Sequence, residues 1–315
     1  MKTNSWLKLS FFVLAVPACA ALALLCGSTG IPDRDILLQV RLPRVFLALL
    51  TGAALAGSGT VMQGVLRNPL ADPYILGTSA GAAVGMTLAL ISGIPYNSGL
   101  FYIFTAGGAF LATAAAYFVA HGQGKTTPSS LILSGVIINT FLGAFILLFF
   151  TIYRNESFSV LYFMMGSVTE GSREVRLYSF VLFALGAVLA WAPARTVDAM
   201  SMGEEKAVTM GIDPERFKIT AFAASALMTA AAVSASGIIG FTGLIVPHAV
   251  RIIVGPSHKT LFPCTLLAGA AFMALMDALG RCLMPPTEIP VGILTALCGA
   301  PFFLYILRKN REYRF

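Results

Sequence analysis

Long apolar stretches separated by short polar connections dominate this chain. A helix needs about 20 apolar residues to cross the ~30 Å hydrocarbon core of a bilayer. Ten stretches approach or reach that length, and they cover residues 9–27, 44–64, 75–93, 101–120, 131–152, 177–194, 218–236, 239–254, 261–283 and 290–307. The pattern predicts an all-α polytopic membrane protein, with about ten transmembrane helices in a single domain over residues 1–315.

The seventh and eighth stretches are the least clearly separated, because no polar loop lies between them. Residues 218–254 are too long for one crossing at about 1.5 Å per residue and long enough for two. The glycines of GIIGFTG at 237–243 allow the backbone to turn. We therefore predict a break within this segment.

Composition and the N-terminal residues agree with a membrane protein. Hydrophobic residues make up 57% of the chain and charged residues 11%, whereas soluble domains carry about 25% charged residues. Lys2 and Lys8 precede the first apolar run, and VPACA at 16–20 faintly resembles a signal-peptide cleavage site. The run continues from Leu9 to Cys26, beyond the ~7–15 residues of a signal peptide. We interpret it as the first membrane helix.

Positive charge indicates the orientation. The net charge of +7 is spread over the loops, without the aromatic-interleaved basic patch expected for nucleic-acid binding. Ten crossings with both termini in the cytoplasm leave 14 of the 21 Lys and Arg residues inside, in agreement with the positive-inside rule. The outside residues are Arg34, Arg41, Arg44, Arg154, Arg173, Arg176 and Arg281.

One compact charged segment interrupts the apolar pattern near the middle of the chain. AMSMGEEKAVTMGIDPERFK, residues 199–218, falls on the cytoplasmic side of this topology. Ser201 and Glu204 match the S-x-x-E capping box of a helix start, and Gly211 is placed as a C-terminal cap. The Asp-Pro pair that follows predicts the N-cap and first turn of another helix. We predict a short helix, a break and a second helix, with a solvated loop as the alternative.

Catalytic, cofactor and metal sites are not evident. HGQGKTT at 121–127 contains Gly-Lys-Thr, but a P-loop needs G-x-x-x-x-G-K-[ST] after a strand, and Val119 occupies the first glycine position. The five cysteines form no C-x-x-C pair, and the three histidines do not cluster with acids. We predict no enzyme activity, no cofactor, no metal site and no nucleotide site.

Two polar residues fall inside predicted membrane helices. Asp277 there would cost about 2.5–3.5 kcal/mol on insertion scales. Arg281, one turn later, would lower that cost as an i,i+4 ion pair, so we favour a local structural pair over a proton relay. Asn139 would line a path or form a helix–helix hydrogen bond, and both interpretations stay open.

Two glycine patterns bear on helix packing. Gly77, Gly81 and Gly85 form a small-xxx-small face for close helix contact. GTVMQGVLRNP at 59–69 and GFTGLIVPH at 240–248 both run from glycines through apolar residues to a proline, once in each half. Internal repeats with Gly/Pro-interrupted helices are typical of transporters.

Several of these segments are similar to one known family. RLPRVFLALLTGAALAGSGTVMQGVLRNPLADPYILGTSAGA, from Arg41, resembles the permease subunits of bacterial ABC importers for ferric siderophores, haem and cobalamin, the FecCD type. The same resemblance is carried by LYFMMGS at 161–167, MGEEKAVTMGID at 202–213, GFTGLIVPHAVR at 240–251 and EIPVGILTALCGAPFF at 288–303. It extends, in order, over essentially the whole chain.

The resemblance implies a type II ABC importer permease fold with two related halves. It further implies a homodimer in the bacterial inner membrane, with spans five and ten lining a central path. Two cytoplasmic ATP-binding subunits, a periplasmic binding protein and membrane lipid would be its partners, and no nucleic acid. The substrate would be a ferric siderophore, haem or cobalamin, among which the sequence does not choose.

Site roles carry over by position. The docking arginines for the binding protein correspond to Arg41, Arg44 and Arg281. Half of a cytoplasmic gate corresponds to Asn68 and Leu70, and the facing half to Pro128-Ser129, where a proline replaces the expected hydroxyl residue. Residues 199–217 resemble the coupling helices that fit a cleft of the ATPase, and the matching positions are Ser201, Gly203, Glu204, Glu205, Ala207 and Gly211.

Two other functions compete with an importer permease. An ion-gradient-driven secondary transporter needs buried carboxylates or unwound ion-binding backbone, and Asp277 is nearly alone. A membrane enzyme needs a catalytic set that this sequence lacks.

Overall fold

The computed structural model describes residues 4–27, 32–96, 98–121, 126–153 and 157–309. Over these ranges the chain forms helices and short connections, without any β-strand. The helices are α1 (Asn4–Leu25), η1 (Ile36–Arg41), α2 (Leu42–Val65), η2 (Pro73–Leu76), α3 (Thr78–Ile91), α4 (Gly99–Ala120), α5 (Pro128–Ile152), α6 (Ser157–Met165), α7 (Arg173–Trp191), α8 (Ala194–Ser201), α9 (Glu204–Thr209), α10 (Pro214–Ser236), α11 (Thr242–Val254), α12 (His258–Cys282) and α13 (Val291–Lys309).

Ten of these helices coincide, in order, with the ten predicted spans. Seven helical segments are long and apolar enough to cross a membrane, and the longest joins η1 and α2 into 30 residues. Three shorter apolar helices, α3, α11 and α13, account for the other three predicted spans. The all-α membrane fold predicted from the sequence is therefore confirmed.

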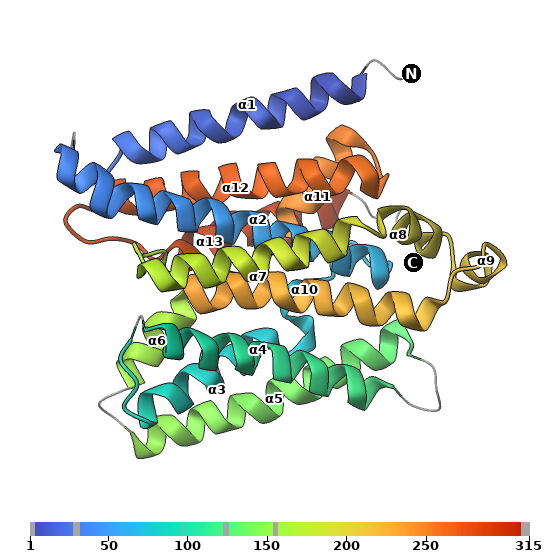
Figure 1. The fold of residues 1–315 in the computed structure, drawn as a ribbon, viewed down its shortest axis with the longest axis horizontal. Coiled ribbons are helices and arrows are strands. Elements are labelled where there is room, and N and C mark those ends of the chain that lie inside the picture. The colour runs from blue at the N-terminus through green and yellow to red at the C-terminus, as the bar shows by residue number, and fades with distance from the viewer. Residues whose placement is uncertain (1–3, 28–31, 97, 122–125, 154–156, 310–315) are drawn as a thin grey trace.

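Both chain termini lie at the end of the bundle that carries α8 and α9 (Figure 1). We call this end the α9 end. The opposite end, where η1 joins α2 and where α12 ends, is the far end. Two termini at the same end are what an even number of crossings requires.

Helices α2, α10 and α12 form the centre of the bundle, and α1 lies at its edge (Figure 1). In the most apolar window of each helix, 89% of the residues are buried for the η1–α2 segment, 72% for α10 and 61% for α12. The same share is 11% for α1. Helix α1 therefore exposes most of its surface, although it packs along α12 through Phe12 and Ala23.

Glycines bring the central helices into backbone contact. A Cβ atom added at Gly52 of α2 would lie 2.1 Å from the carbonyl oxygen of Gly269 in α12. A Cβ atom at Gly59 would lie 1.9 Å from the carbonyl oxygen of Gly243 in α11. The second contact joins the two repeat-like segments, 59–69 and 240–248, which therefore pack against each other. The predicted glycine face of α3 also packs closely, since a Cβ at Gly81 would lie 2.3 Å from the oxygen of Gly108 in α4.

Two features of the fold differ from the predicted spans. The second span begins at Ile36 rather than near residue 44, because η1 continues directly into α2. Pro43 does not end this helix, and it lies where the π-helix η1 passes into α2. The nine-residue helix α6 was not predicted.

The predicted break between the seventh and eighth spans is confirmed, and Gly237, with φ 69°, ends α10.

Candidate functional site

The charged segment 199–218 lies at the α9 end, where α9 protrudes beyond the rest of the bundle (Figure 1). Gly203 precedes α9 with φ 119°, and no side chain caps the helix start. Gly211 follows it with φ 79°. The N–H of Gly211 donates to the oxygen of Val208, and the N–H of Ile212 to that of Ala207, at 2.9 and 3.1 Å. This is a Schellman motif, which confirms the capping position predicted for Gly211.

The predicted capping box of Ser201 and Glu204 is wrong. Ser201 is the last residue of α8, and its hydroxyl donates backwards to the carbonyl oxygens of Val197 and Asp198, at 2.7 and 3.0 Å. Hydroxyl side chains near a helix end bond to the preceding turn as readily as they cap a following one. The predicted helix over 201–211 is therefore the end of α8, a turn through Gly203, and α9.

The start of α10 is as predicted. The Asp213 carboxylate accepts hydrogen bonds from the backbone N–H groups of Glu215 and Arg216, at 3.1 and 3.2 Å. Pro214 occupies the first turn, where no N–H is needed. The expected order of short helix, break and second helix is confirmed.

Helix α8 is fixed to the bundle through one carboxylate. Asp198 accepts a hydrogen bond from the backbone N–H of His258 at 2.8 Å and lies 2.7 Å from Nδ1 of the same residue. The Ser257 hydroxyl also donates to Asp198, at 3.2 Å. Asp198 thereby caps the N-terminus of α12 from a different helix, a favourable position for a negative charge. The buried His258 ring packs on Gly64 of α2, where an added Cβ would approach Nε2 to 2.8 Å.

Helix α9 is fixed through a different carboxylate. Glu204 Oε1 lies 3.0 Å from Nζ of Lys218 in α10. Lys218 Nζ also donates to Glu215 Oε1 at 2.9 Å and to the carbonyl oxygen of Thr126 at 2.5 Å. Thr126 immediately precedes Thr127, the N-cap of α5. The Gly-Lys pair of the rejected P-loop match, at 124 and 125, lies outside the described residues.

The outer face of α9 mixes apolar and charged side chains. Met202, Val208 and Met210 are more than half exposed, at 57%, 56% and 62%. Glu205 and Lys206 are exposed beside them, whereas Ala207 is fully buried. Exposed methionine and other apolar side chains next to charges are typical of protein–protein contact surfaces. The charges of this segment are evident in the sequence, whereas the exposure of its methionines becomes evident only in the structure.

The predicted gate residues lie in two connections. Asn68 Oδ1 accepts a hydrogen bond from the N–H of Leu70 at 2.9 Å, and Leu70 is 38% exposed. Ser129 is exposed in the first turn of α5. Pro128 fits this turn, because the first residue of a helix has no intrahelical acceptor for its N–H.

The predicted docking arginines lie at the far end, but they are engaged within this chain. Arg41 is 4% exposed and donates to the carbonyl oxygens of Leu24 and Leu25 at 2.8 and 2.9 Å. Arg281, also 4% exposed, donates to the oxygens of Ala23 and Cys26 at 2.7 and 2.8 Å. The two guanidinium groups thus cap the last turn of α1, where cations are favourable. At the other end of α1, Lys8 Nζ donates to the oxygen of Ile253 at 2.5 Å.

Asp277 joins the remaining charges of the far end. Its carboxylate is fully buried and lies 3.1 Å from Arg281 Nε, which confirms the predicted i,i+4 pair. Arg44 also pairs with Asp277, at 3.0 Å, and with Glu288, at 2.8 Å. Asn139 Nδ2 donates to the carbonyl oxygen of Tyr74 at 3.2 Å, so its side chain bonds across to another segment of the chain.

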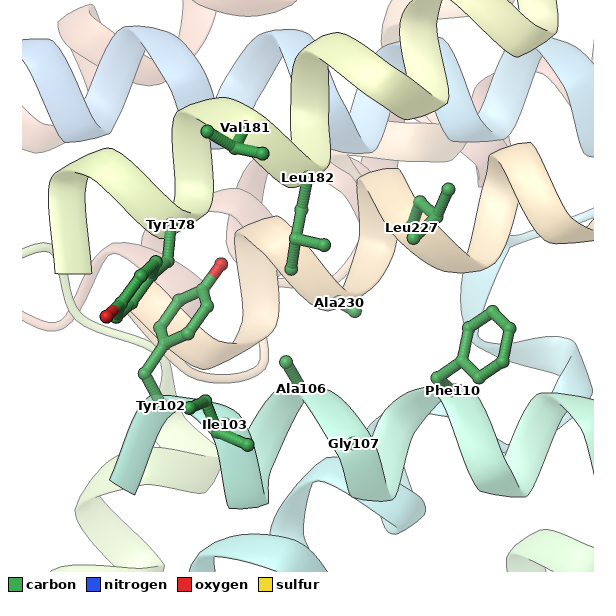
Figure 2. Close-up of a pocket in the computed structure, with 10 residues that line it drawn as sticks. All are labelled: Tyr102, Ile103, Ala106, Gly107, Phe110, Tyr178, Val181, Leu182, Leu227 and Ala230. Atoms are coloured by element: carbon green, nitrogen blue, oxygen red, sulfur yellow. The ribbon is translucent and has the colours of Figure 1, made fainter. Parts of the chain in front are cut away.

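Two cavities lie away from these charged residues. One, of about 410 Å³, opens between α4, α7 and α10, with Tyr102 and Tyr178 at one end and Phe110 at the other (Figure 2). Its remaining lining is aliphatic, which suits an apolar ligand rather than a charged one. A second cavity, of about 450 Å³, lies among α6, residues 238–240 and α13 and is lined mainly by apolar side chains and glycines.

Metal-binding clusters are absent from the described residues, where no group of three or more His, Cys, Asp or Glu side chains is arranged to hold an ion. The five cysteines, all within the described ranges, are free thiols.

Known proteins are similar to this chain over most of its length. The profile of the FecCD transport family matches residues 5–309. A cobalamin import system permease, BtuC of Halobacterium salinarum, is 42% identical over 292 residues, which cover 90% of this chain and 77% of that protein. The hemin transport system permease HmuU of Yersinia pestis is 38% identical over 285 residues, which cover 88% of this chain and 84% of that protein.

A solved structure is also similar over nearly the full length. It is described as an inward-facing conformation of a metal-chelate type ABC transporter, and it matches with a TM-score of 0.87 and 33% identity over 97% of this chain and 99% of that one. The YvrB permease of Bacillus subtilis, 40% identical over 296 residues, covers 91% of this chain and 84% of its own length. This multi-pass membrane chain therefore belongs to the FecCD transport family, whose members are permeases of ABC importers.

Proposed function

We propose that this chain is the permease of an ATP-driven importer that takes up a metal chelate delivered by a periplasmic binding protein. Two copies of the chain would form the path, and two separate ATP-binding subunits would dock at the α9 end. A ferric siderophore is the favoured substrate, and haem and cobalamin are the other members of the class. Relatives named for cobalamin and hemin, and a similar structure of metal-chelate type, support this class.

The observation that carries the proposal is the construction of α9. This helix stands outside the bundle, ends in its own Schellman motif, and presents Val208 and Met210 beside charged residues. A solvated loop would need neither a defined helix nor exposed apolar side chains. A helix of this kind is suited to a groove on a partner protein. We therefore assign ATPase coupling to α9 and to the residues flanking it, Ser201, Gly203, Glu204, Glu205, Ala207 and Gly211.

We place the α9 end in the cytoplasm and both termini with it, in the inner membrane. The excess of Lys and Arg on that side supports this orientation. Single cysteines at Ser172, which caps α7, and at Ser257, which precedes α12, test it. We expect Ser172 to be labelled from the periplasm and Ser257 from the cytoplasm. Labelling of both from one side would contradict the ten-span topology.

We place the substrate path between two copies of the chain, along α5 and α13. The apolar cavity against α13 supports this assignment. Asn68 and Leu70, together with Ser129, would form the cytoplasmic gate, since both segments lie in connections between spans. A path with few fixed polar groups leaves substrate selection mainly to the binding protein.

We place the binding protein at the far end. The docking role of Arg41, Arg44 and Arg281 stays a prediction, because these side chains also have partners within the chain. A proton- or ion-driven transporter is less well supported, since Asp277, the carboxylate it would use, is held by two arginines.

Reconstitution tests the proposed function. The purified chain, the co-encoded ATPase and the co-encoded binding protein would be placed in proteoliposomes, and uptake of a ferric siderophore, haem and cobalamin measured in parallel. We expect uptake of one substrate that requires ATP and the loaded binding protein. Uptake driven by an ion gradient without the ATPase would show a secondary transporter instead.

A further inference from the structure

We propose that Lys218 transmits movement of α9 to the first turn of α5, the helix that carries Ser129. This inference rests on the coupling function proposed above and assigns a positioning residue to it. Three chain segments meet at Lys218 Nζ. Glu204 comes from α9, Glu215 from α10, and the carbonyl oxygen of Thr126 from the segment entering α5, at 3.0, 2.9 and 2.5 Å.

Burial makes this junction specific. Lys218 is 2% exposed, although it lies in the second turn of a helix at the end of the bundle. The Lys218 ammonium group donates two hydrogen bonds, to Thr126 and Glu215, and forms an ion pair with Glu204. Removing such a charge from water is costly unless it is paired and hydrogen-bonded, so these three partners hold Lys218 in one place. A lysine on a solvated loop would remain in water.

The connection to α5 is rigid. Thr126 donates from its N–H to Glu215 Oε1 at 3.1 Å and from its hydroxyl to Glu215 Oε2 at 2.6 Å. His121 Nδ1 lies 3.1 Å from the Thr126 hydroxyl and 3.7 Å from Glu215 Oε2. The next residue, Thr127, caps α5 through the N–H of Ser130 at 3.1 Å. Movement of Lys218 and Glu215 must therefore carry the start of α5 with it.

The connection to α9 is weaker. Glu204 contributes one ion pair to Lys218, and its side chain is 37% exposed. Lys218 keeps Glu215 and Thr126 as partners when Glu204 moves away. The junction thus has a permanent side, toward α5, and a side that makes or breaks one contact as α9 is displaced. Glu204 and Lys218 together act as positioning residues between the ATPase and the gate.

The experiment measures movement at both sides of the junction in the assembled transporter. The five native cysteines are replaced, and a single spin label is placed at Val208 on α9 or at Ser129 on α5. The distance between the labels of the two copies is then measured with and without trapped ATP. In the unaltered chain we expect both distances to change when ATP is trapped.

In Lys218→Met we expect the change at position 208 to remain and the change at position 129 to fall at least threefold. ATP-dependent uptake should fall at least tenfold. Arg216→Met is the matched control, because it removes a cation from the same end of α10 while its side chain is 88% exposed. This control should behave like the unaltered chain.

Glu204→Gln gives a second test that leaves Lys218 with two acceptors, in case Lys218→Met does not assemble. It should reduce the change at position 129 in the same way, whereas Asp213→Asn, which removes an exposed carboxylate that pairs with Arg216 instead, should not. A full change at position 129 in these variants would overturn the proposal for Lys218 while leaving the importer function intact. Absence of ATP-dependent uptake, or of movement at position 208, in the unaltered complex would instead refute the proposed function, and this inference with it.

Discussion

The two ends of this bundle hold their charged residues in different ways. At the far end, Arg41, Arg44 and Arg281 gather around the end of α1 and the buried carboxylate of Asp277. At the α9 end, Asp198 and Glu204 reach from two short helices to separate positions on the bundle. The far-end charges bond mostly to carbonyl groups and carboxylates of long neighbouring helices. The α9-end charges join short helices to long ones.

This difference distinguishes charges that attach a helix to the bundle from charges that, in the proposed function, transmit movement between helices. At the far end, Arg41 and Arg281 donate to carbonyl oxygens at the end of α1 and add to the packing of α1 along α12. At the α9 end, each carboxylate crosses between elements that would move relative to one another in a transport cycle. Charge at a membrane boundary therefore does not by itself indicate a docking surface. Its partners decide which role it has.

Replacing Asp277, the buried carboxylate at the far end, should give the largest loss of stability. Asp277→Asn leaves Arg44 and Arg281 with less compensation in a buried site, which typically costs about 3–5 kcal/mol. We expect a large drop in thermal stability in detergent and poor accumulation in the membrane. Glu288→Gln is the control, since its side chain is 39% exposed and an exposed pair contributes about 0–1 kcal/mol. Equal losses for both variants would contradict the central role of Asp277.

Breaking α9 should abolish coupling while leaving the bundle intact. Ala207→Pro removes the hydrogen bond from the N–H of Ala207 to Gly203 and introduces a clash, at a local cost of about 3 kcal/mol. We expect normal insertion and dimerisation, uptake reduced at least tenfold, and ATP hydrolysis that no longer responds to the loaded binding protein. Ala207→Ser is the control, because it keeps this N–H group and nearly the same volume. Wild-type coupling in Ala207→Pro would contradict the assignment of α9.

Replacing one capping arginine should loosen α1 and also test the docking prediction. Arg41→Met removes the hydrogen bonds to Leu24 and Leu25, which we expect to cost about 2 kcal/mol. Thermal stability should fall, and the folded fraction should bind the binding protein less tightly, as the predicted docking role requires. Unchanged affinity would leave anchoring of α1 as the role of this arginine. Arg34→Met, at an exposed arginine near η1, should leave stability unchanged. Loss of affinity at unchanged stability in Arg41→Met would favour docking over anchoring.

The smallest change in stability should come from Asp72, a carboxyl group that, unlike Asp277, has no arginine partner among the described residues. Asp72 forms no ion pair within the described part of the chain, and its carboxylate accepts the N–H of Tyr74 at 2.8 Å. Burial raises its pKa to about 6, above the unfolded value of about 3.9. Between these two pKa values, Asp72 is protonated more in the folded state than in the unfolded state. The free energy of unfolding should therefore fall, by on the order of 1 kcal/mol, as pH rises from about 4 to about 6.

Asp72→Asn keeps the hydrogen bond to Tyr74 and should remove this pH dependence. The measurement is thermal unfolding in detergent between about pH 4 and pH 7.5, with Asp213→Asn, at an exposed helix cap, as the matched control. An unchanged slope in Asp72→Asn would assign the dependence to another group.

The sequence predicted interactions between residues close together in the chain. The spans, the cap at Gly211 and the pair of Asp277 with Arg281 all follow from local patterns. Ser201 was misassigned, because a serine at a helix end serves the preceding helix or the following one with similar chemistry. Local patterns therefore predict elements well and the choice between adjoining elements less well.

The junctions that join the elements could not be predicted in this way. Asp198 lies 60 positions from His258, Lys218 lies 92 from Thr126, and Arg44 lies 233 from Asp277. Only the packing of helices brings these partners together, and a single sequence contains no sign of it. The three arginines were expected on the surface for the same reason, since nothing near them in the chain indicated the carbonyl groups that they cap.

The two glycines with positive φ that flank α9 allow the sequence of this helix to vary independently of the bundle. Gly203 and Gly211 set its length, and a side chain added at either would meet no atom within 4 Å, so the surroundings do not dictate its sequence. Of its six residues, only Ala207 is fully buried and only Glu204 forms an ion pair with the bundle. The other four positions are free to change with the ATPase that we propose docks there. Substitutions in this one short helix could therefore adapt the permease to a different ATPase without any change in its membrane helices.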